Sequence, residues 1–152
     1  MCDFNSSVLL EGSVVKTSFT YGACNIRPPE LLLGAHSYGP EVDMWAVGLI
    51  LVALRIWKIL VINPFNFEPK DYGSNIDNTL RAICQKLGPI TEHNLPGCTS
   101  LPEWNNIYSS SHSSFDLSFP EIEDELSALI KPMLRYNPRT RLTARAALQA
   151  IN

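Results

Sequence analysis

The sequence lacks a marked excess of charge of either sign. Its 152 residues include 12 Lys and Arg against 15 Asp and Glu, which gives a formal net charge of −3. The basic residues are scattered along the chain and form no cluster. Proteins that bind nucleic acids gather Lys and Arg into a basic patch that follows the phosphates. We therefore expect no nucleic-acid partner.

Closely spaced cysteines and histidines are also missing. No Cys-x-x-Cys pair occurs, and no spacing is typical of a zinc site, among Cys2, Cys24, Cys84, Cys98, His36, His93 and His112. The first residues show neither the basic nor the apolar region of a signal peptide. These absences favour a reduced, intracellular environment.

One apolar segment, residues 44–62, approaches the length of a membrane span. It contains Arg55 and Lys58, which would lie on one face of a helix. Each would cost roughly 2.5–3.5 kcal/mol near the centre of a bilayer. The uninterrupted part, residues 44–54, is too short to span. A buried helix at the centre of a helical domain is favoured, and no membrane partner is expected.

Hydrophobic periodicity predicts a mainly α fold. We expect one continuous central helix over residues 44–60, in which Trp45, Ile50, Leu51 and Leu54 are largely buried. Further amphipathic helices are predicted over residues 75–87, 121–135 and 144–151. The helix at residues 75–87 should be capped by Ser74 or Asn75 and end at Gly88, and the helix at residues 144–151 should be capped by Thr143.

The remaining segments predict irregular structure. Residues 6–26 are expected to form an extended loop that can include a short strand, and residues 30–33 a short helix that ends at Gly34. The proline-rich insert at residues 89–120 contains a serine run that is expected to be mobile. Pro132 lies inside a predicted helix, so we expect a kink near residues 128–131.

Three sequence blocks, in this order, carry a family resemblance. Residues 27–34 read RPPELLLG and are followed by YGPEVDMWAVG at residues 38–48. Residues 80–89 read LRAICQKLGP, and residues 133–148 read MLRYNPRTRLTARAAL. Together they resemble the C-terminal lobe of a cyclin-dependent protein kinase. The sequence at residues 38–48 and the Cys-x-Ser-Leu-Pro sequence from Cys98 are most similar to the kinase-activating, transcription-linked branch.

The resemblance implies a kinase-like C-terminal lobe fragment with an N-terminal activation segment. Residues 1–30 would be the activation-segment-like region, and residues 31–152 the helical subdomain. Only two residues precede Asp3, so a Gly-rich loop, a strand lysine and a catalytic loop have no place before it. We therefore expect a lobe without an N-lobe, assign no catalytic residue, and expect this chain alone to be catalytically incompetent.

The family implies serine/threonine phosphorylation with Mg-ATP, a cyclin partner and protein substrates, in the nucleus or cytoplasm. Asp3-Phe4-Asn5 stands where the magnesium-binding Asp-Phe-Gly motif would lie, 27 positions before Glu30. Asp3 is thus a candidate magnesium ligand. Asn5 replaces the family glycine. Ser18 falls at the position of the activating phosphorylation, with Arg27 the only nearby arginine.

Several residues are expected to be structural. By resemblance, Glu30 pairs with Arg141 and fixes the segment to the lobe. Asp43 and Trp45 match the Asp-x-Trp of the central helix, where the family aspartate binds the catalytic loop. Without that loop Asp43 is expected to be hydrated or unsatisfied. Residues 23–26 (ACNI) depart from the family pattern before Arg27, which suggests relaxed constraint.

Three hypotheses therefore stay open. The chain is part of a cyclin-dependent kinase, or it is a stand-alone pseudokinase lobe that acts as a protein-interaction module. In the second case the helices at residues 75–87 and 122–135 would bind partners. The third is a membrane-anchored protein that uses residues 44–62.

Overall fold

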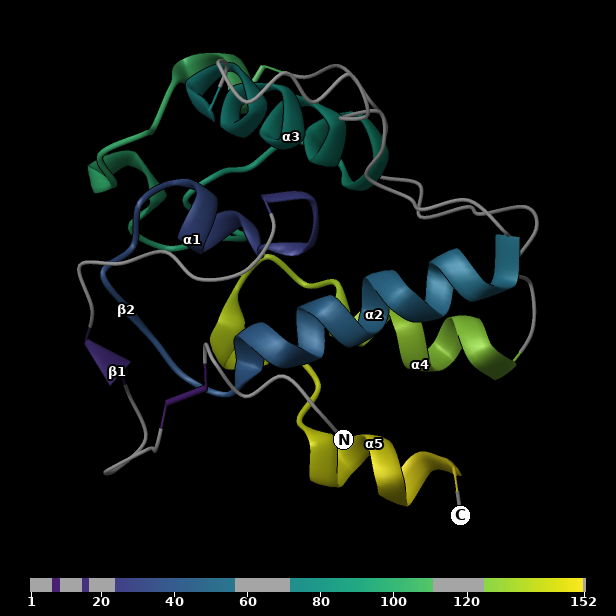
Figure 1. The fold of residues 1–152 in the computed structure, drawn as a ribbon. Helices are drawn as coiled ribbons and strands as arrows, with labels where there is room; N and C mark the ends of the chain where they lie inside the picture. The colour runs from purple at the N-terminus through teal and green to yellow at the C-terminus, as the bar shows by residue number, and fades with distance from the viewer. Residues whose placement is uncertain (1–6, 9–14, 17–23, 57–71, 111–124, 152) are drawn as a thin grey trace.

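The computed structural model describes residues 7–8, 15–16, 24–56, 72–110 and 125–151, and these are mostly helical (Figure 1). The helices are α1 (Pro29–Leu32), α2 (Glu41–Ile56), α3 (Tyr72–Leu87), α4 (Glu125–Met133) and α5 (Ala144–Ile151). Short 3-10 helices are η1 (Cys24–Ile26), η2 (Cys98–Ser100), η3 (Asn106–Tyr108) and η4 (Pro138–Thr140). The mainly α prediction is confirmed for these residues.

The long helix α2 packs against α4 (Figure 1). Gly48 makes this close approach possible, because a Cβ atom there would lie 2.9 Å from Leu134 Cδ2 and 3.0 Å from Met133 Cβ. The same side of α2 buries Trp45, Leu49 and Val52. The predicted central helix is therefore present. Its expected end near residue 60 lies outside the described residues.

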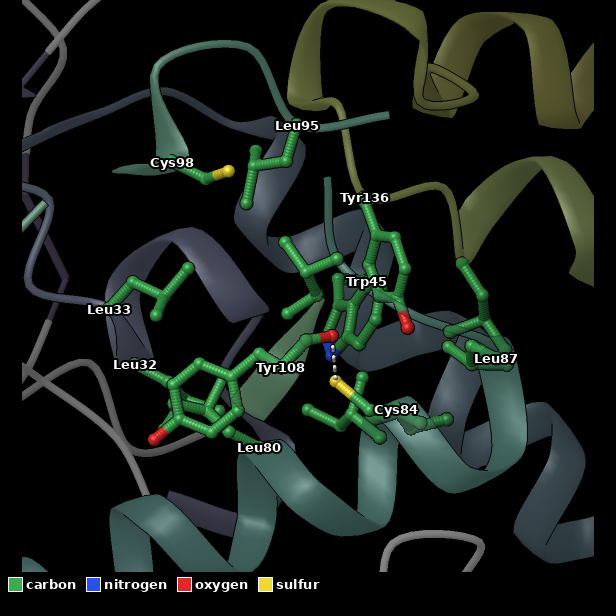
Figure 2. Close-up of a cluster of buried hydrophobic side chains, with 14 of the residues drawn as sticks. Leu32, Leu33, Trp45, Leu80, Cys84, Leu87, Leu95, Cys98, Tyr108 and Tyr136 are labelled. Atoms are coloured by element: carbon green, nitrogen blue, oxygen red, sulfur yellow. Dashed lines mark hydrogen bonds between the residues drawn. The ribbon is translucent and has the colours of Figure 1, made fainter. Parts of the chain in front are cut away.

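The helix α3 forms the other side of the core. It packs against α1 and η1, and η1 also contacts α2. Side chains of α2 and α3 belong to one buried cluster, as expected of helices on the two sides of a shared core, and α1 and η1 contribute to the same region (Figure 1). Figure 2 shows the resulting cluster, in which buried side chains of α1, α2 and α3 meet those of the 95–108 segment and Tyr136.

Two short strands join the beginning of the chain to the lobe. β1 (Val15–Lys16) pairs antiparallel with β2 (Ser37–Tyr38), with Val15 opposite Tyr38. The short strand allowed for within residues 6–26 is therefore present. The pairing places residues 15–16 beside the segment that leads from α1 into α2.

The ends of three helices agree with the sequence. Gly88 directly follows α3 and Gly34 is the second residue after α1. Both have left-handed φ angles, 88° and 89°, a conformation that glycine adopts without a Cβ clash. The Thr143 hydroxyl accepts a hydrogen bond from the Ala146 N–H at 3.2 Å and caps α5. These predicted boundaries are confirmed to within one residue.

Two predicted helix boundaries were wrong. α3 already begins at Tyr72, so Ser74 and Asn75 lie inside the helix and do not cap it. Pro132 lies at the next-to-last position of α4, where only one residue of helix follows it. The helix predicted over residues 121–135 therefore ends at Met133. Pro132 has no N–H to donate to the carbonyl four residues before it, and its own carbonyl accepts a bond from Leu142 N at 3.0 Å. The expected kink near residues 128–131 stays a prediction. The start predicted at residues 121–124 lies outside the described residues.

The largest correction concerns the burial of α2. Trp45 is buried and Leu51 is half-buried, as expected, but Ile50 is 51% exposed and Leu54 is 66% exposed. Both point away from α4, because a helix turns by about 100° per residue and α4 covers the Leu49 and Val52 side. Within the described ranges, no helix combines the length and apolarity needed to cross a membrane.

Candidate functional site

The guanidinium of Arg141 is the centre of the most connected polar site in the described structure. It forms a bidentate pair with Glu30 on α1, with Nη1 at 2.8 Å from Oε1 and Nη2 at 3.0 Å from Oε2. Its other N–H groups donate to three backbone carbonyls, those of Glu41, Tyr136 and Arg135, at 3.0, 3.1 and 3.0 Å. All five donors of this side chain are therefore used.

The ion pair predicted between Glu30 and Arg141 is thus formed. The two residues are 111 positions apart in the sequence, and both are buried. Breaking such a pair on one side leaves an uncompensated buried charge, which typically costs several kcal/mol. The pair joins the segment that contains Pro28 and Pro29 to the chain after α4 and, through the Glu41 carbonyl, to the start of α2.

The guanidinium lies over one aromatic ring, which stacks on a second. Its Cζ lies 5.2 Å from the centroid of the Trp45 ring, which stacks on Tyr136 with ring centroids 6.3 Å apart. The Tyr136 hydroxyl donates to the Gly88 carbonyl at 2.6 Å, so the stack also reaches the end of α3. The Trp45 indole N–H is buried and meets no acceptor among the residues that the structure describes. A cation above a desolvated Trp ring gains a further favourable contact.

The electrostatics of Glu30 follow from its burial. Desolvation raises the pKa of the Glu30 carboxyl above its usual value, while the hydrogen bond and the charge of Arg141 oppose that rise. An ionised Glu30 therefore depends on the presence of Arg141.

Of the other residues expected to be structural, Arg27 and Trp45 are buried and Asp43 is exposed. Arg27 is buried next to η1, and its backbone N–H donates to the Cys24 carbonyl at 3.3 Å. The side chain of Asp43 is exposed near the start of α2. Asp43 and Trp45 lie two residues apart and so project from different sides of the helix. The structure therefore brings Trp45 to the Glu30–Arg141 pair and leaves Asp43 in solvent.

Two predicted sites cannot be placed. Asp3, the candidate magnesium ligand, and Ser18, the candidate phosphorylation site, lie outside the described residues. Elsewhere in the described ranges, no group of three or more His, Cys, Asp or Glu side chains is arranged to hold a metal ion. Magnesium binding thus stays an expectation from Asp3 alone.

Three residues that hold the lobe together were not predicted from the sequence: Tyr136, Gly48 and Glu92. Tyr136 was within a recognised motif, but its hydroxyl bond to Gly88 links parts 48 residues apart and leaves no local signal. Gly48 was noted only as part of the Asp-x-Trp-x-x-Gly pattern, and its role is steric. Glu92 closes the loop before η2 by accepting bonds from the N–H groups of Gly97 and Thr99, at 2.6 and 2.9 Å.

Known proteins similar to this chain are protein kinases. The family model for the protein kinase domain matches residues 1–151. Cyclin-dependent kinase 7 of Dictyostelium discoideum is 38% identical over 122 residues, covering 80% of this chain and 31% of that protein. Cyclin-dependent kinase 7 of Xenopus laevis is 41% identical over 123 residues, covering 81% of this chain and 32% of that protein.

A solved structure is similar in fold as well. A chain in the structure of the CAK complex from Chaetomium thermophilum, bound to ATP-gamma-S, superposes with a TM-score of 0.64 and 29% identity. The match covers 84% of this chain and 38% of that chain. This chain spans about a third of the length of the cyclin-dependent kinase 7 relatives. It belongs to the protein kinase domain family and, within that family, to the cyclin-dependent kinases of the transcription-linked branch.

Proposed function

We propose that these 152 residues form the C-terminal lobe portion of a cyclin-dependent serine/threonine kinase. The observation that carries the proposal is the Glu30–Arg141 pair, which joins the first and last recognised kinase blocks in the manner that the resemblance predicted. In the proposed kinase, phosphoryl transfer from Mg-ATP to a protein Ser or Thr takes place with a cyclin bound, in the nucleus or the cytoplasm.

The proposed role of this lobe is to hold the activation segment. Residues 1–30 form the activation-segment-like region in this proposal, and residues 31–152 form the helical subdomain that anchors it. Arg141 fixes the end of the segment, and phosphorylation of Ser18 would regulate it. Buried Arg27 lies at the start of the anchored part. Positioning dominates phosphoryl transfer, so a fixed segment matters for catalysis.

The 152-residue chain by itself is proposed to be catalytically incompetent. Its sequence contains no Gly-rich loop, strand lysine or catalytic-loop aspartate and asparagine in the family pattern. Asp3 is the one residue matched to the magnesium-binding set, and Asn5 replaces the glycine that normally ends the Asp-Phe-Gly motif. Groups that act as a unit are not additive, so Asp3 alone should not supply a fraction of the rate.

A second candidate function is a stand-alone pseudokinase lobe that binds other proteins. It is favoured by three large apolar side chains that lie exposed on one side of α2: Val47, Ile50 and Leu54. Their spacing of three and four residues places them on a single helix face. An apolar row of this kind is usually covered by another part of a protein or by a partner.

A chimera distinguishes the two candidates. The N-terminal part of Dictyostelium cyclin-dependent kinase 7, up to its Asp-Phe-Gly motif, would be fused in front of Ser6 of this chain and assayed with a cyclin and radiolabelled ATP. The kinase proposal expects phosphate transfer that is lost in the chimera with Arg141→Ala and kept with Arg145→Ala. A folded chimera that transfers no phosphate would favour the interaction module.

The isolated chain supplies the complementary test. Calorimetry with Mg-ATP should show no binding, and a radiolabel assay with a generic peptide should show no transfer. Asp3→Ala is the control. Transfer by the isolated chain that disappears in Asp3→Ala would overturn the proposed incompetence.

A further inference from the structure

A small cavity opens between the end of α4, the chain that follows it, and the turn after α3. Its volume is about 240 Å³. Small-molecule sites usually measure about 300–1,000 Å³, so this cavity is better matched to one side chain of a peptide than to a cofactor. None of its lining residues belongs to the Glu30–Arg141 pair or to the magnesium motif.

The floor of the cavity is apolar. Leu87 at the end of α3, Leu134 and Tyr136 line it, and all three are buried in the core. Figure 2 shows Leu87 and Tyr136. The Tyr136 hydroxyl is already bonded to Gly88. The floor therefore offers packing surface for an apolar side chain.

The rim carries cationic and other donor groups. Lys131 on α4, Arg135 and the titratable His93 are exposed at its edge, and the lining includes no Asp or Glu. Lys131 forms no ion pair with any residue that the structure describes. The Arg135 Nη1 donates to the Thr140 carbonyl at 2.9 Å, which holds the guanidinium at the rim.

The acidic side chain next to His93 in the sequence is bonded within its own loop. Glu92 precedes His93, and its carboxylate accepts bonds from the backbone of Gly97 and Thr99 in its own loop. Neither Lys131 nor Arg135 forms an ion pair with a carboxylate among the residues that the structure describes. Their positive charge is complementary to an acidic ligand.

We propose that this cavity is a docking site for a short acidic segment of a partner protein. One Leu or Met of the segment would fill the apolar floor, and flanking Asp or Glu side chains would pair with Lys131 and Arg135. The site goes beyond phosphoryl transfer, because Lys131, the Arg135 guanidinium and His93 take no part in the Glu30–Arg141 pair or the magnesium motif.

A labelled peptide tests this directly. Fluorescence anisotropy would measure binding of the 152-residue chain to a fluorescent EELEE peptide at low salt. Lys131→Glu should weaken binding by about tenfold, and Arg135→Gln should weaken it to a similar degree. The matched control is Arg145→Glu on the exposed face of α5, which makes the same charge change away from the cavity and should leave the affinity unchanged.

Two peptide controls separate docking from general charge attraction. An EESEE peptide keeps the charge but lacks the apolar side chain, so it should bind several-fold more weakly than EELEE. Equal binding of the two peptides, equal weakening by Lys131→Glu and Arg145→Glu, or no binding of EELEE would each overturn the proposal.

A photo-crosslinking residue in place of the peptide leucine gives a readout that needs no variant. Crosslinks should map to residues 87 and 134–137. Crosslinks confined to other surfaces would also contradict the site.

Discussion

The two sides of α2 differ sharply. One side is closed: Trp45, Leu49 and Val52 are almost fully buried, and Gly48 lets α4 approach to van der Waals contact. The other side is open, with Val47, Ile50 and Leu54 exposed to solvent. The same apolar helix therefore contributes a finished core on one side and an unused apolar surface on the other.

This difference separates the contacts that the lobe makes within itself from the surface that another part of a protein would cover. The closed side continues into the Trp45–Arg141–Glu30 contacts, which are complete within the described residues. The open side begins near exposed Asp43, the residue that resembles the family's contact to the catalytic loop. The closed side carries the proposed anchoring of the activation-segment-like region. The open side is where the rest of the proposed kinase or a partner would pack.

The largest expected effect is at the closed side. Arg141→Ala should lower the free energy of unfolding by about 3–5 kcal/mol, because it leaves Glu30 buried without its partner. Chemical denaturation measures this change. Arg145→Ala, at an exposed position of α5, should change stability by less than about 0.5 kcal/mol. Equal effects of the two substitutions would mean that Arg141 behaves as a surface arginine.

Truncating one leucine on each side compares the two sides directly. Leu49→Ala should cost about 2–5 kcal/mol in the isolated chain, because it opens a cavity against α4. Leu54→Ala should change stability by less than about 0.5 kcal/mol, because its side chain is 66% exposed. Thermal and denaturant unfolding would check both values. In the chimera described above, Leu54→Ala should become costly if the added part covers this face.

Filling the contact at Gly48 should have a smaller effect. Gly48→Ala places a methyl group 2.9 Å from Leu134 Cδ2, which forces α4 to move and costs about 1–3 kcal/mol. The better helix propensity of alanine offsets up to about 1 kcal/mol of this. Denaturant unfolding checks it, and Leu134→Ala in the same chain should relieve part of the strain. A more stable Gly48→Ala protein would contradict the close packing of α2 on α4.

The smallest expected effect lies in the loop closed by Glu92. Hydrogen bonds from the Thr99 hydroxyl and from the backbone of Thr99 and Gly97 lower the pKa of Glu92 to about 2. A carboxyl whose pKa is lowered on folding stabilises the protein fully at pH values above its ordinary pKa, 4.5. That stabilisation is lost as the pH falls from 4.5 toward 2. Glu92→Gln should therefore flatten the fall of the unfolding midpoint over this range. Glu103→Gln, an exposed carboxyl that makes none of these bonds, is the control.

Motif positions predicted the anchoring pair but not its surroundings. Glu30 and Arg141 were paired from the sequence because both lie in family blocks with fixed roles. The three carbonyl bonds of Arg141 and the stack of Trp45 on Tyr136 depend on the turn after α4, which no local pattern indicates.

Periodicity located α2 but could not orient it. Nearly every residue of this helix after Asp43 is apolar, so the pattern does not distinguish the face toward α4 from the open face. Ile50 and Leu54 were predicted to be buried for that reason, and the structure shows them exposed. The cationic cavity near Lys131 could not be predicted from the sequence either, because its lining comes from segments about 40 residues apart.

A double-mutant cycle on Glu30 and Arg141 tests the central claim most directly, that this pair fixes the activation-segment-like region to the lobe. The free energy of unfolding would be measured for Glu30→Ala, Arg141→Ala, the double variant and the unmodified chain. A coupling energy of about 2–3 kcal/mol is expected, at the upper end of the range for residues in contact. A coupling energy below about 0.5 kcal/mol would contradict the anchoring role.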